Sequence, residues 1–183
     1  TGFFKIIGVE GLGIGNVKRI TDAGYDTIPK IIKMNIDDFL KLEGFKNKLA
    51  KKINKNIKEK IDSTTLPELM QATNIFGRGF GERRFKTILN EIPDILTSTN
   101  SPSDKIVKLN EINGLAEKTS AKLVDKISEF LVWIKEAELE DKLEHNLNNT
   151  SNTDMDVNHP LYNKKYVISG FRDNDLISNL KKE

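Results

Sequence analysis

Val9-Glu10-Gly11-Leu12-Gly13 is the first of four similar stretches in the chain, in each of which a glycine is followed by an apolar residue and then by a small or polar residue. In three of the four, an apolar residue also stands two positions before the glycine. The others are Leu42-Glu43-Gly44-Phe45-Lys46, Arg78-Gly79-Phe80-Gly81 and Ile112-Asn113-Gly114-Leu115-Ala116. Their first glycines are spaced by 33, 35 and 35 residues. Near-constant spacing indicates one supersecondary unit that is used four times.

A helical pattern follows each stretch. In residues 46–61, Leu49, Ile53, Ile57 and Ile61 are four residues apart with lysines between them, which is typical of an amphipathic helix. Helices are expected at residues 17–23, 28–33, 36–41, 46–61, 66–73, 82–90, 92–97, 103–110 and 117–144. Residues Thr27, Asn35 and Ser101 are suited to cap the helices that follow them. The sequence therefore predicts a mainly α fold made of tandem helix-hairpin-helix repeats.

The repeated turn suggests an anion-binding function. Glycine enters backbone conformations with positive φ at little cost, and the apolar residue after it is expected to point inward and anchor the turn. The next helix begins with unpaired N–H groups and a partial positive charge. A DNA phosphate is the natural occupant of such a site. These contacts would position the protein on DNA without reading bases.

The candidate DNA-binding residues are the turn glycines and the polar residues just after them. They are Gly11, Gly13, Gly15, Asn16, Lys18, Gly44, Lys46, Asn47, Lys48, Gly79, Gly81, Arg83, Arg84, Gly114, Lys118 and Thr119. At the second glycine position, Lys46 either adds a phosphate contact or weakens the backbone contact. The fourth turn has Ala116 there and is the weakest candidate. The alternative interpretation is ordinary helix-connecting turns in a protein-interaction domain, because glycine commonly terminates helices.

Composition limits the function classes. The chain has 183 residues, no cysteine and a net charge of +2, so disulfides and thiolate metal sites are excluded. Residues 41–60 hold eight lysines against two glutamates, whereas acidic residues dominate residues 136–156. Only the early part is thus expected to face a polyanion, unless these lysines simply form a solvated helix face. His145 and His159 lie in polar sequence, and we expect no metal site.

The chain also divides by composition. Residues 1–145 form the predicted hairpin domain, and residues 146–161 are rich in Asn, Thr, Ser and Asp and are expected to be a linker. In residues 162–183, Tyr166-Val167-Ile168-Ser169 predicts a strand, and a helix is expected to start near Asp175. No apolar run reaches the roughly 18 residues of a membrane span, and no signal peptide is recognisable. We expect an intracellular fragment of a longer protein.

These motifs resemble a known family. Residues 3–130 are similar to the four-hairpin domain of NAD-dependent DNA ligases, notably at Val9–Gly13, Glu43–Lys48 and Ile112–Leu115. Residues 166–172 resemble the first strand of a BRCT domain, which would add an incomplete α/β part to the fold. Two departures occur in the third hairpin. Its start at Ile75–Arg78 is longer than usual, and Phe85 stands where a small residue is common.

The resemblance implies an enzyme that seals nicks in duplex DNA during replication and repair through an AMP intermediate. It implies NAD and magnesium for the whole enzyme, with zinc as a further candidate upstream, but no cofactor in this segment. Because the sequence has no Lys-x-Asp-Gly motif and no four-cysteine site, no catalytic residue is assigned. The expected partner is nicked double-stranded DNA, with a protein partner for the BRCT domain, in a bacterial cytoplasm or a virus-infected cell. The alternatives are a hairpin module of a structure-specific nuclease or repair polymerase, and a protein-interaction scaffold.

Overall fold

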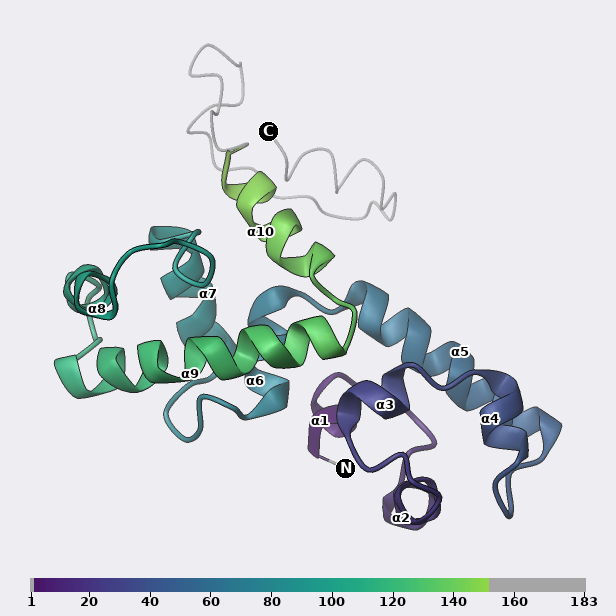
Figure 1. Ribbon diagram of the computed structural model, residues 1–183. Coiled ribbons are helices and arrows are strands. Elements are labelled where there is room, and N and C mark those ends of the chain that lie inside the picture. Colours follow the sequence, from purple (N-terminus) through teal and green to yellow (C-terminus); the bar gives the residue numbers. More distant parts are fainter. Residues whose placement is uncertain (1, 152–183) are drawn as a thin grey trace, which may run out of the picture. The chain divides into compact units, whose positions relative to one another are not determined.

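The computed structural model describes residues 2–151 of the chain (Figure 1). Residues 1–147 form one compact unit, and a second unit begins at Asn148. The described helices are α1 (Gly2–Ile6), α2 (Ile14–Asp22), α3 (Ile28–Ile32), α4 (Ile36–Leu40), α5 (Asn47–Ser63), α6 (Leu66–Thr73), α7 (Glu82–Glu91), α8 (Pro102–Asn110), α9 (Glu117–Glu136) and α10 (Asp141–Ser151). The described part contains no strand, and the predicted BRCT start at 162–183 lies outside it.

Eight of these helices form four hairpins. The pairs are α1 with α2, α4 with α5, α6 with α7, and α8 with α9, joined by a first turn (residues 7–13), a second turn (41–46), a third turn (74–81) and a fourth turn (111–116). All four repeated stretches end at the residue before the second helix of a hairpin. The predicted mainly helical hairpin architecture is thus confirmed in the described residues.

The hairpins pack in sequential pairs. In the first pair, α5 lies against the first turn, where the Glu10 N–H donates to Asn56 Oδ1 at 3.3 Å. In the second pair, α9 lies against the third turn, where Lys122 Nζ donates to the Arg78 carbonyl at 3.1 Å. The long second helix of each pair therefore fixes the position of the first turn of that pair.

A row of aromatic rings joins the two pairs. Phe3 of α1 lies 5.6 Å from Trp133 of α9, measured between ring centroids, and Trp133 stacks on Phe130 at 6.0 Å. Phe130 in turn contacts Phe76 of the third turn at 5.4 Å. In addition, α1 packs on α6. The two pairs therefore share one hydrophobic core.

Three expected elements differ in the structure. Residues 92–97 form successive turns instead of a helix, because Pro93 keeps Ile92 out of the helical region, at φ −134° and ψ 78°. The helix expected at 117–144 ends at Glu136, and Glu138 adopts a left-handed φ of 59°. Residues 146–151 of the expected linker belong to α10.

The expected caps are present. Thr27 and Ser101 accept hydrogen bonds from the amides three residues later in α3 and α8. Asn35 forms a reciprocal capping box with Asp38 at the start of α4. None of the described helices is long and apolar enough to cross a bilayer. The short helix α1 was not expected from the sequence, and it supplies the buried rings of Phe3 and Phe4.

Candidate nucleic-acid interface

The four turns share one backbone conformation. The first glycine of each stretch has a positive φ, namely 85° at Gly11, 81° at Gly44, 98° at Gly79 and 86° at Gly114. The apolar residue that follows is buried in every turn, at 6%, 4%, 8% and 8% exposure for Leu12, Phe45, Phe80 and Leu115. The glycines and the residues after the apolar anchor are exposed. The turns therefore present main chain to solvent.

The helices that follow these turns start without a side-chain cap. Their N-cap residues are Gly13, Lys46, Gly81 and Ala116, and no cap side chain accepts a hydrogen bond there. By contrast, α3, α4 and α8, which follow no glycine turn, are capped by oxygen atoms of Thr27, Asn35 and Ser101. An external anion can therefore bind where the chain provides no internal acceptor.

The four helix starts are not equally open. The structure gives the first three amides of α2 and of α5 no acceptor within residues 2–151. In α9 the Thr119 N–H donates to the Ala116 carbonyl at 2.8 Å. In α7 the Glu82 N–H donates to Gln71 Oε1 at 2.7 Å, and the Arg84 N–H donates to the Gly81 carbonyl at 3.0 Å. The first pair thus offers the most free amides and the third turn the fewest.

Charges near the helix starts follow the same division. The first turns of α2 and α5 contain no acidic residue, whereas α7 and α9 begin with Glu82 and Glu117. Glu82 pairs with Lys86 at 2.5 Å, and this hydrogen bond raises the pKa of Lys86 above its usual range. A carboxylate at this position interacts favourably with the helix dipole and so competes with a bound phosphate.

The candidate side chains fall into two groups. Lys46, Asn47, Lys48, Arg83 and Lys118 are exposed beside their turns, and the described residues offer them no ion pair. Other candidates already have partners inside the protein. Asn16 Nδ2 donates to the Gly11 carbonyl at 2.7 Å, and Arg84 Nη1 donates to the Gly79 carbonyl at 2.5 Å.

Three further candidates are less well placed to contact an anion. Lys18 points along α2 to Asp22, with which it pairs at 2.6 Å. Gly15 lies inside α2, with open space around it and no positive φ, so its conformation does not require glycine. Thr119 is half-buried at the start of α9. Among all the candidates, Asn16 and Arg84 brace their turns through hydrogen bonds to main-chain carbonyls. The exposed and unpaired Lys46, Lys48, Lys118 and Arg83 are available to bind an anion.

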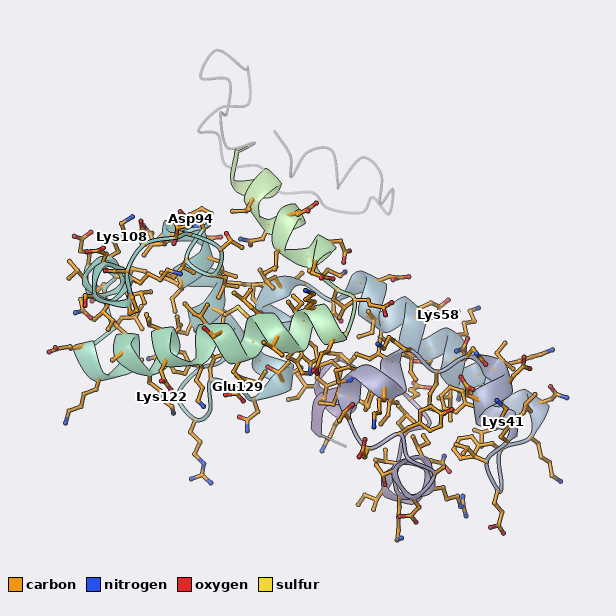
Figure 2. The ribbon with its side chains drawn as sticks, in the orientation of Figure 1. Lys41, Lys58, Asp94, Lys108, Lys122 and Glu129 are labelled. Atoms are coloured by element: carbon orange, nitrogen blue, oxygen red, sulfur yellow. The ribbon has the colours of Figure 1, made fainter. Side chains whose placement is uncertain are left out.

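Besides Arg78, which lies in the third turn itself, two basic residues were missed by the sequence reasoning. Arg19 of α2 lies beside the second turn, since a Cβ on Gly44 would be 3.3 Å from its Nη1. Lys122 of α9 reaches the third turn and lies 5.9 Å above the Phe80 ring (Figure 2). Neither follows its own turn directly, so only the packing of α2 and α9 against the neighbouring hairpin reveals them.

Two hollows lie beside the third turn. A groove of about 390 Å³ is lined by Gly79, Gly81, Arg83 and Arg84 of the third hairpin and by Ile112–Leu115 of the fourth. A second hollow of about 850 Å³ is lined by Arg78 together with residues that include parts of α1, α2 and α6. In Figure 1 the second and third turns project toward the same, lower side of the unit. The described residues contain no cluster of potential metal ligands.

Known proteins share this sequence in part. Residues 3–59 match the SAM-like helix-hairpin-helix tandem family. A DNA ligase of Acanthamoeba polyphaga mimivirus is 40% identical over 137 residues, which are 74% of this chain and 22% of that relative. A putative DNA ligase 052L of Invertebrate iridescent virus 3 is 33% identical over 94 residues, covering 51% of this chain and 12% of the relative.

The chain therefore spans less than a quarter of the length of the curated relatives it matches. No solved structure matches it.

Proposed function

We propose that this chain is the duplex-binding segment of a DNA ligase, and that it grips the sugar-phosphate backbone through its glycine turns. The observation that carries the proposal is the set of four exposed glycine turns, the first two of which lead into helices whose first three amides have no acceptor within residues 2–151. Both viral relatives are named as DNA ligases, the second as putative, which favours a ligase over a nuclease, a polymerase or a protein scaffold. Such binding would be independent of base sequence.

The finer proposal is that the ligase uses NAD and seals nicks, and that a BRCT domain follows the hairpins. Its support is the resemblance of residues 3–130 and 166–172 to that family. NAD and magnesium would act in a catalytic part of the longer enzyme, and we assign no residue of this segment to either of them. The viral relatives favour an infected host cell as its location. We propose no catalytic step for the residues of this chain.

The N-cap position of α2 allows a direct test. Gly13 has an ordinary φ of −67°, and a Cβ there would meet nothing within 4 Å, so other residues fit. In Gly13→Asp the new carboxylate should cap α2 and occupy the amides proposed for phosphate. We expect a small rise in melting temperature, equivalent to a few tenths of a kcal/mol because glycine is already an acceptable N-cap residue, while duplex DNA affinity falls.

Fluorescence anisotropy with a labelled nicked duplex and an unrelated nicked sequence measures the affinity. Gly13→Ala is the matched control, because it adds a Cβ without a cap or charge, and it should bind DNA like the original chain. The proposal fails if the original chain shows no salt-sensitive DNA binding. It also fails if Gly13→Asp is stabilised yet binds DNA unchanged. Comparing nicked with intact duplex then tests the proposed preference for nicks.

A further inference from the structure

We propose that the third turn holds the DNA backbone with the guanidinium groups of Arg78 and Arg83, whereas the first two turns use main-chain amides. The inference rests on the proposed function and assigns different chemistry to turns that look equivalent in sequence. Its first support is the start of α7, where two of the first three amides already donate hydrogen bonds within the protein. Gln71 accepts from the Glu82 N–H at 2.7 Å, and the Gly81 carbonyl accepts from the Arg84 N–H at 3.0 Å.

Gln71 is important because it comes from the first helix of the same hairpin. Its side chain crosses the hairpin and takes the acceptor role that an anion would otherwise have at the start of α7. The carboxylate of Glu82 stands at the same helix start and is 36% exposed despite its ion pair with Lys86. A phosphate would meet fewer free amides and a negative charge here, so the main chain alone is a poor anion site.

Arginine is concentrated at the third turn, where most amides at the start of the following helix already have an acceptor within the protein. Three of the five arginines in the chain, Arg78, Arg83 and Arg84, lie at the third turn, although lysine greatly outnumbers arginine in the chain. Arg84 braces the turn through the Gly79 carbonyl. Arg78 and Arg83 are exposed, and within residues 2–151 the structure gives their guanidinium groups no ion pair or hydrogen bond.

The two free guanidinium groups belong to residues that line different hollows beside the turn. Arg78 lines the hollow shared with α1 and α2, and Arg83 lines the groove shared with the fourth turn. Lys122 braces the turn, because its Nζ donates to the Arg78 carbonyl and lies 5.9 Å from the centroid of the Phe80 ring. A guanidinium group binds phosphate oxygens in a bidentate manner, so two of them on a braced turn can grip the phosphates of one strand.

The test compares Arg78→Ala and Arg83→Ala with Lys108→Ala in the full chain. Lys108 is an exposed cation on α8 without an ion pair in the described residues, and Figure 2 shows it on the upper side of the view and Lys122 on the lower side. Affinity for an intact or nicked duplex is measured by anisotropy from low to moderate salt. Each arginine variant should lose about tenfold in affinity and about one unit of the slope of log K against log salt. Lys108→Ala should change neither appreciably.

Arg83→Lys tests whether the guanidinium group matters beyond its positive charge. Gln71→Ala tests whether the main-chain amides of α7 contribute to binding. Arg83→Lys should keep the salt slope of the original chain but only part of its DNA affinity. Gln71→Ala frees the Glu82 amide and should leave the dependence on both arginines intact. Melting curves verify folding of every variant.

If the original chain binds DNA but either arginine variant behaves like Lys108→Ala, the inference is overturned and the proposed function stands. If the original chain does not bind DNA, the proposed function itself fails.

Discussion

Ser120 and Ala50 show how one atom distinguishes equivalent positions. Both are fully buried and both follow the N-cap residue by four positions, in α9 and α5 respectively. The Ser120 hydroxyl has no hydrogen-bond partner in the described residues. A buried hydroxyl without a partner is destabilising, because it loses its bonds to water and gains none.

We therefore expect Ser120→Ala to raise the free energy of unfolding by about 0.5–1 kcal/mol. Ala50→Ser, the reverse change at the matching position, should lower it by a similar or larger amount. Urea denaturation followed by circular dichroism measures both. A destabilised Ser120→Ala would show that the hydroxyl has a partner after all.

Asp38 links the cap of α4 to pH. The Asn35 N–H donates to its carboxylate at 3.1 Å, and this bond, with Lys41 and Tyr25 nearby, lowers the pKa of Asp38 below its ordinary value of 3.8. Because the folded pKa is depressed, the contribution of this carboxylate to stability is complete above the ordinary value and is lost as pH falls through the lowered one.

Asp38→Ala should therefore reduce stability at neutral pH by about 1 kcal/mol, the usual effect of removing a helix cap. The difference from the original chain should shrink in acid, once the carboxylate protonates in both states. Asp37→Ala is the control, since Asp37 is exposed in the same helical turn. Melting temperatures across this acidic range test the expectation, and a difference that does not depend on pH would contradict it.

At the scale of elements, the long start of the third hairpin has a packing role. Phe76, which belongs to this extra length, is buried against Phe80, Phe85 and Phe130, with ring centroids 6.1, 5.1 and 5.4 Å away. Phe85 stacks on Phe80 at 5.6 Å, so the residue that departs from the family pattern fills the same cluster. The two departures from the family pattern therefore contribute rings to the same aromatic cluster.

Phe76→Ala should lower the free energy of unfolding by about 3–5 kcal/mol, because it leaves a cavity beneath the third turn. Val132→Ala is the control, since Val132 is 58% exposed on α9 and should change stability by less than about 0.5 kcal/mol. Chemical denaturation of both variants provides the comparison. Similar stabilities would show that the aromatic cluster relaxes around the missing ring.

At the scale of the whole described unit, the contact between Phe3 and Trp133 joins the two hairpin pairs. Because residues that share one hydrophobic core unfold together, residues 2–147 should unfold in a single cooperative transition. Trp133 is the only tryptophan of the chain and reports on α9 by its fluorescence. Its urea midpoint should coincide with the midpoint of NMR signals from α5. Two separate midpoints would instead indicate independent hairpin pairs.

The local sequence by itself determined the repeated turns, their buried apolar anchors, the amphipathic faces of α5 and α9 and the caps at Thr27, Asn35 and Ser101. These features depend on the backbone freedom of glycine, on helical periodicity and on neighbouring residues, all of which are readable along the chain. Only the tertiary structure decided which turns are open. The bond from Glu82 to Gln71, the approach of Arg19 to Gly44 and the ring contact of Phe3 with Trp133 join residues 11, 25 and 130 positions apart. Packing brings such residues together, and no local pattern specifies that packing.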